Sequence, residues 1–256
     1  MGSEEGVKLL VVRARAAGVA TACLGLALLV GACGHPSSTS STRSPSSPSA
    51  TPTNGIADKS PKQIIAAAEK ALASAKSVHM KGTLRESGQR YTFDLFLKRA
   101  SAKGSMTAPM QGIKHAQFDF VLAEGRMFIR SSTLWKQAGG TAAATLLNNR
   151  WVVLPGSSIR DFPFRNVKTF TRSMGSGPKG KPRLAGAVTM INGRPAIPVK
   201  SGDSIVYVAT TGEPVPLRVM PSSHSAGTGV ADFTDYNVPV KIGPPPNAVD
   251  LNQLHD

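Results

Sequence analysis

Residues 91–98 read YTFDLFLK, and residues 115–122 read HAQFDFVL. In both stretches large apolar side chains alternate with polar ones, which is the pattern of a β-strand with one buried face. Further short stretches of strand-forming residues, separated by turn residues, lie at 78–84, 102–108, 126–130, 151–154, 187–191, 195–199, 204–209, 216–220 and 230–236. Because short turns join neighbouring strands, we expect an antiparallel sheet that largely follows chain order.

A helix is predicted just before the first strand. Ser60 can cap it, Pro61 suits its first position, and Gln63 can complete a capping box. A second, short helix is expected at 141–148, whereas residues 157–174 could form a helix or a loop. The sequence therefore predicts an α+β fold, in which a curved sheet can enclose helices or an apolar ligand on its concave face.

The N-terminal residues have the character of an export signal. Three basic residues precede an uncharged, apolar stretch at 16–30, which is short for a membrane-spanning helix. Residues 30–33 read VGAC and look like a lipobox, whose cysteine receives a diacylglycerol thioether and becomes the first residue after cleavage. We therefore predict lipidation of Cys33. The alternative is an ordinary signal peptide with an incidental cysteine.

The neighbouring sequence agrees with this interpretation. Cys23 is a weaker candidate for lipidation, because it lies within the apolar stretch. Residues 34–55 are rich in Ser, Thr and Pro and have too few apolar side chains to fold, so a tether is expected. The predicted organisation is a signal peptide (1–32), the lipidated cysteine with a disordered tether (33–59), and a single domain (60–256).

Charge and cysteine content narrow the range of partners. The chain has a formal net charge of +15, and 27 basic and 13 acidic side chains follow residue 32. Such a surface could attract anionic lipid headgroups or an acidic envelope polymer, or it could simply be solvated. Nucleic acid is not an expected partner, because no stretch combines clustered basic residues with aromatic ones. Neither cysteine lies in the domain, so no disulfide or thiolate metal site is expected there.

The sequence carries no motif for catalysis, metal binding or cofactor binding. His79 and the other histidines are far apart and form no metal-ligand spacing. Asp232 and Asp235 could form an acid–base pair only if the strand bends, since residues three apart on a strand face opposite sides. The basic loop GSGPKGK at 175–181 could hold a phosphate-bearing headgroup, but a solvated hairpin loop is the simpler interpretation. We expect no enzyme activity, no metal and no cofactor.

Five stretches together resemble the actinobacterial LppX/LprG-type lipoproteins, whose fold is LolA-like. They are SVHMKGTL (77–84), NNRWVVLP (148–155), INGRPAIPV (191–199), IVYVATTGEPVPLRV (205–219) and FTDYNVPV (233–240). The resemblance implies a strongly curved antiparallel half-barrel with helices packed on its concave face. Some members of this family carry lipids or glycolipids between the sheet and the helices, and the resemblance brings no catalytic motif.

Strand alternation suggests which side chains would line such a cavity, although core packing is the alternative role for each. The candidates are Phe93, Leu95, Phe118, Phe120, Met127, Ile129, Tyr207 and Val219. The expected function is a monomeric, non-catalytic carrier or binder of lipid or glycolipid, held by its diacylglycerol on the extracytoplasmic face of the bacterial cell membrane. The alternative function is an envelope protein-interaction or sensor module without a ligand cavity.

Overall fold

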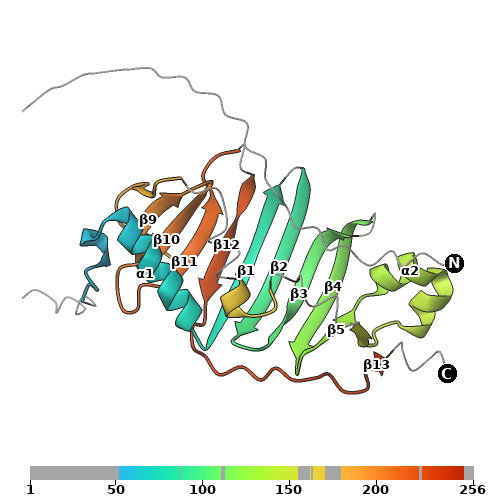
Figure 1. Cartoon of the computed structure of the whole chain (residues 1–256). Helices are drawn as coiled ribbons and strands as arrows, with labels where there is room; N and C mark the ends of the chain where they lie inside the picture. The colour runs from blue at the N-terminus through green and yellow to red at the C-terminus, as the bar shows by residue number, and fades with distance from the viewer. Residues whose placement is uncertain are drawn as a thin grey trace, which may run out of the picture. The chain divides into compact units, whose positions relative to one another are not determined.

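A computed structural model of the chain describes residues 52–86, 88–110, 113–154, 162, 164–170, 180–224 and 227–250. The expected signal peptide, Cys33, most of the expected tether and most of the basic loop lie outside this part of the chain. The described residues form one large sheet with helices packed against it (Figure 1). None of the helices in this part combines the length and the apolar character that crossing a bilayer requires.

The sheet is open and mostly antiparallel, as the sequence predicts. Its strands lie in the order β13-β6-β5-β4-β3-β2-β1-β12-β11-β10-β9-β7, and β8 also pairs with β9. Among the described residues only β13 and β6 pair in parallel. The strands are β1 (Ser77–Glu86), β2 (Gln89–Lys98), β3 (Ala102–Met110), β4 (Ile113–Ala123), β5 (Arg126–Arg130), β6 (Val152–Leu154), β7 (Arg183–Leu184), β8 (Thr189–Ile191), β9 (Arg194–Ser201), β10 (Ser204–Ala209), β11 (Pro216–Pro221), β12 (Thr228–Thr234) and β13 (Val249–Asp250).

Two runs of neighbouring strands meet where β1 pairs with β12. The register runs from His79 opposite Thr234 to Arg85 opposite Thr228. At this seam the backbones approach so closely that only glycine fits: a Cβ on Gly82 would collide with the carbonyl oxygen of Val230. These contacts make the two halves one continuous sheet.

Helix α1 (Pro61–Ser74) begins where the sequence predicts it. The backbone N–H of Gln63 donates to Ser60 Oγ, and the side chain of Gln63 accepts from the backbone N–H of Ser60, which confirms the capping box. The helix packs on β9 and β10 through a buried cluster that includes Ile64, Ala68, Ile197, Val199 and Val208.

Helix α2 (Ser132–Leu146) begins earlier than the helix predicted at 141–148. Ser131 caps it, since its hydroxyl accepts a hydrogen bond from the backbone N–H of Leu134. The helix is kinked at Gly139 and Gly140, and Gly140 has a φ of 68°. This pair of glycines breaks the helical pattern, which is why the sequence indicated only the part after the kink.

A short segment between β6 and β7 covers the middle of the sheet. It consists of Phe162 and residues 164–170, and we call it the cover segment; its residues 167–170 are helical. Figure 1 shows it in front of β1 and β2, on the same side as α1. Leu72 of α1 and Phe170 of the cover segment share one apolar cluster. We call this side of the sheet the inner face and the opposite side the outer face.

The folded unit includes residues before the expected domain start at residue 60. Thr53 forms a β-bridge with Thr211, and the side-chain amide of Asn54 donates to the carbonyl oxygens of Ala209 and Gly212. A 3-10 turn (Ile56–Asp58) follows, in which Ile56 is buried. The chain is therefore fixed to the ends of β10 and β11 from about Pro52 onward.

Candidate functional site

An apolar cluster spreads over the inner face from β12 to β6. Most of the predicted lining residues are buried in it, namely Phe93, Leu95, Phe118, Phe120, Met127 and Ile129. Val219 is partly buried and packs against the same cluster. Alternation therefore placed these side chains on the correct side of the sheet, where they form the floor beneath the cover segment.

Tyr207 does not lie with them, although it was predicted to face inward. It pairs with Arg218, whose guanidinium contacts Asp232 on the outer face, and partners in register share a side of the sheet. Its hydroxyl contacts Met220 on that same face. Residues 205–209 are all apolar or aromatic, so alternation could not tell which of them point inward.

The cover segment contacts the sheet mainly through aromatic rings. Phe162 packs edge-on against Phe120, with ring centroids 4.9 Å apart. Phe170 lies 5.9 Å from Phe233 of β12, and Phe164 lies between the two, 5.9 Å from Phe162 and 5.8 Å from Phe170. The sequence analysis left this segment as helix or loop. The aromatic pair in Phe162-Pro163-Phe164 was the signal that could have placed it on the apolar face.

Trp135 of α2 brings one polar group into this apolar interior. The side chain is 8% exposed and belongs to the same cluster. Its indole Nε1–H has no hydrogen-bond partner in the described structure. A buried donor without a partner costs about 1–3 kcal/mol, so an acceptor that reached this atom would bind favourably.

The outer face carries a row of paired charges across neighbouring strands, and Val121, Ala123 and Phe128 form a small buried apolar cluster at its β4–β5 end. Arg218 of β11 donates two hydrogen bonds to Asp232 of β12, one of them 2.8 Å long. Further along the row, Lys81 Nζ lies 3.0 Å from Asp94 Oδ2. At the far end Arg130 Nη2 lies 2.8 Å from an Asp119 oxygen. Each of these three cations faces a carboxylate on an adjacent strand.

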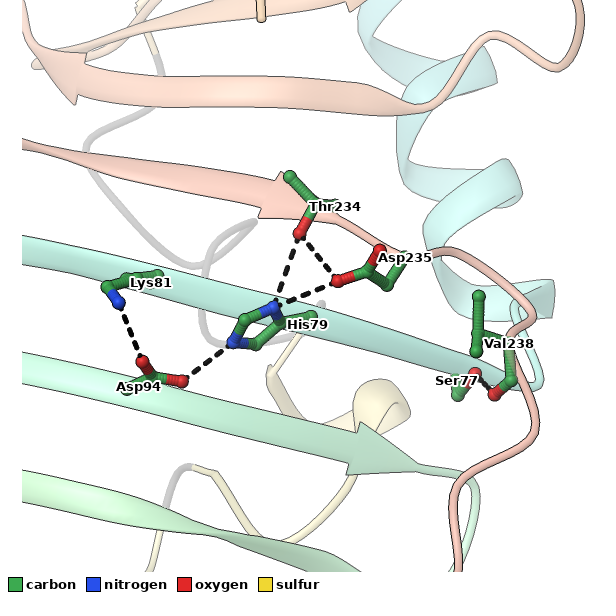
Figure 2. A network of polar contacts seen from close by, with 7 residues as sticks. All are labelled: Ser77, His79, Lys81, Asp94, Thr234, Asp235 and Val238. Carbon is green, nitrogen blue, oxygen red and sulfur yellow. Dashed lines mark hydrogen bonds and ion pairs between the residues drawn. The ribbon is translucent and has the colours of Figure 1, made fainter.

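His79 forms the centre of a network that joins this row at Asp94 (Figure 2). Its Nε2 lies 2.7 Å from Asp94 Oδ1, and its Nδ1 lies 3.0 Å from Asp235 Oδ2. The ring stacks on Phe96 with centroids 4.2 Å apart. Burial disfavours the ionised form of Asp94, but hydrogen bonds from His79 and Lys81 and their charges outweigh it, so the pKa of Asp94 lies below its ordinary value.

This network resembles a nucleophile–histidine–carboxylate arrangement, but its geometry indicates a clamp between strands. Thr234 Oγ1 lies 3.3 Å from His79 Nδ1 yet donates to Asp235 Oδ2, which is also the nearer partner of that nitrogen. With a carboxylate at each ring nitrogen, His79 has no free nitrogen to act as a base. Asp232, bound to Arg218, does not pair with Asp235. We assign this network no catalytic role.

A hollow of about 520 Å³ lies next to the network on the outer face. Its lining includes the short hydroxyl side chains of Thr83, Thr92, Ser105 and Thr107, with Asp94 at one side. Apolar residues, among them Phe93, Met106 and Val230, also contribute to the lining, so the hollow is polar only in part. Among the described residues, no group of three or more His, Cys, Asp or Glu side chains is placed to hold a metal ion.

Comparisons with known proteins bear on the fold. No family model matches the chain, and no curated protein matches it in sequence. LprF from Mycobacterium bovis is 14% identical, with 77% of this chain and 99% of that chain covered and a TM-score of 0.55. The lipoprotein LppX from Mycobacterium tuberculosis is 16% identical, with 71% and 98% covered and a TM-score of 0.44. The likeness to LprF confirms the fold that the sequence resemblance implied, a curved, open antiparallel sheet with helices on one face.

Because the pKa of Asp94 is lowered in the folded protein, its contribution to stability is present above its ordinary value of 3.8 and is lost as the pH falls through the folded-state pKa. The Asp94→Asn variant should lower the free energy of unfolding at neutral pH by at most about 1 kcal/mol, since 39% of the side chain is exposed. The difference from the parent should vanish in acid. Urea unfolding at neutral pH and in acid measures this difference in the free energy of unfolding. The control is Asp203→Asn, which changes an exposed carboxylate. A difference that persisted unchanged in acid would contradict this role.

Proposed function

We propose that this chain is an extracytoplasmic lipoprotein, anchored through diacylglycerol on Cys33, whose inner face binds the acyl chains of a lipid or glycolipid without catalysing a reaction. The observation that carries the proposal is the contact between the inner face and the cover segment, which consists of rings stacked on apolar side chains. The free energy of apolar contacts does not depend on a particular orientation of the groups. An alkyl chain can therefore replace the rings with little loss of stabilisation.

The energetics favour an acyl chain between these two layers. Each Å² of apolar surface removed from water contributes about 25 cal/mol, and the inner face presents large side chains on β2, β4 and β5. Phe164 is only half-buried and stacks on Phe93 with centroids 6.2 Å apart. This ring lies at the boundary between the apolar interior and the solvent, where a chain would enter.

The unpartnered indole of Trp135 suggests the chemical class of the ligand. An ester carbonyl would accept the hydrogen bond that Nε1–H lacks, whereas a plain hydrocarbon could not. Acyl esters of glycerol or of a sugar combine this acceptor with long alkyl chains. We infer an esterified lipid rather than an unmodified hydrocarbon.

One observation favours a second candidate function. The side chains of the inner face are already packed against the protein's own rings, as expected of an envelope interaction or sensor module without a ligand cavity. In that case the interior would bind no lipid probe. The substitutions below separate the two functions.

The anchor predicts that Cys33→Ser abolishes membrane attachment that resists high salt. Two acyl chains hold a protein stably on a bilayer, because each buried methylene contributes about 0.8 kcal/mol. In bacteria, the variant should lose incorporation of labelled palmitate and leave the membrane fraction during a high-salt wash, which removes proteins held by charge alone, whereas Cys23→Ser should behave like the parent. Retention of Cys33→Ser in the washed membrane fraction after normal processing would exclude this anchor.

The interior site predicts that Phe164→Asp reduces uptake of a fluorescent fatty acyl ester by at least about tenfold, since a carboxylate at the boundary must be desolvated by the entering chain. The matched control is Phe96→Asp, which changes a half-buried phenylalanine on the outer face. Fluorescence titration measures affinity, and circular dichroism checks that both variants are folded. Equal loss in both variants, or loss in neither, would argue against an inner-face site.

The proposed ester contact predicts that Trp135→Phe weakens binding of the acyl ester about fivefold, the effect of one net hydrogen bond. The ring is kept, so binding of diphenylhexatriene, a hydrocarbon without acceptors, should not change. Parallel titrations with the two probes give the comparison. Identical effects on both probes would mean that the indole N–H contacts no ligand.

A further inference from the structure

One edge of the sheet exposes apolar side chains. β7 and β8 both pair with β9 there. Leu184, Val188 and Met190 are 49%, 47% and 61% exposed, and only two other large apolar side chains are similarly exposed among the described residues. We call Leu184, Val188 and Met190 the edge patch.

The register places two of these side chains on one side of the sheet. Leu184 pairs with Val199 and Met190 pairs with Pro195, and these partners lie four positions apart on β9. Residues four apart on a strand face the same way and are separated by about 13 Å. Leu184 and Met190 therefore point together from the edge rather than from opposite faces.

Basic side chains lie close to the edge patch. The described residues 180–202 contain four basic residues and no acidic residue. Lys181 and Arg183 are exposed directly beside Leu184. Exposed apolar side chains flanked by cations match a bilayer surface with anionic headgroups, because the apolar groups enter the interface while the cations meet the phosphates.

The N-terminal chain joins the folded unit close to this edge. Thr53 bridges to Thr211, and the neighbouring Thr210 donates its backbone N–H to Pro195, the register partner of Met190. Only residues 34–51 separate Cys33 from the described structure. A chain of 18 residues can span at most about 60 Å, so an anchor at Cys33 would limit how far this edge can move from the lipid.

We propose that the β7–β8 edge docks on an anionic lipid bilayer, with Leu184, Val188 and Met190 in the interface and with Lys181 and Arg183 facing the lipid phosphates. The proposal extends the proposed function, because the anchor on Cys33 delivers this edge to the membrane. Docking itself does not require the anchor and can be measured without it.

The test uses the chain from residue 33 onward with Cys33→Ser, so that no acyl group contributes to binding. Flotation with vesicles of phosphatidylcholine, with and without phosphatidylglycerol, gives the partition coefficient. The chain should bind the vesicles that contain phosphatidylglycerol, and added salt should weaken binding. Leu184→Ser combined with Met190→Ser should reduce partitioning about tenfold.

The matched control replaces the two remaining exposed apolar side chains, Leu146 and Val238, with serine. It should change partitioning by less than about twofold, since both lie outside the edge patch. Equal reductions in the two double variants, or no binding to anionic vesicles, would overturn the proposal. Vesicle binding that persists even though Cys33 proves not to be acylated in cells would remove the anchor and leave the docking edge intact.

Discussion

β1 and β12 pair along most of their length, although His79 and Thr234 are 155 residues apart in the sequence. Without this pairing, each half of the sheet would end in a row of unpaired N–H and C=O groups. The apolar cluster would also be divided, because Phe233 of β12 belongs to the same cluster as Met80 of β1. The inner apolar layer is continuous, and His79 contacts Asp235 on the outer face, because these strands lie side by side.

Ion pairs neutralise only part of the positive charge of the chain. On the outer face Asp94, Asp119 and Asp232 each contact a cation on a neighbouring strand. The described residues 180–202 contain Lys181, Arg183, Arg194 and Lys200 and no acidic residue. The edge at which β7 and β8 pair with β9 therefore adds positive charge that can act on a partner at short range.

Sequence reasoning succeeded where the signal is local. Alternation identified the inward side chains of β2 and β4, and the pattern at Ser60 identified the start of α1. Alternation failed at Tyr207, because every neighbouring position is apolar. It also did not decide whether the cover segment is a helix or a loop. The contact of His79 with Asp235 could not be predicted, because it depends on a pairing between two strands that lie near opposite ends of the domain's sequence. Long-range register, rather than composition, decides these features.

The anchor and the edge patch would act on different properties of the protein. A tether fixes how far the domain can move from the bilayer but not which side faces it. It also raises the effective concentration of lipid around the edge to the millimolar range, so a weak contact by a few side chains is enough to set orientation.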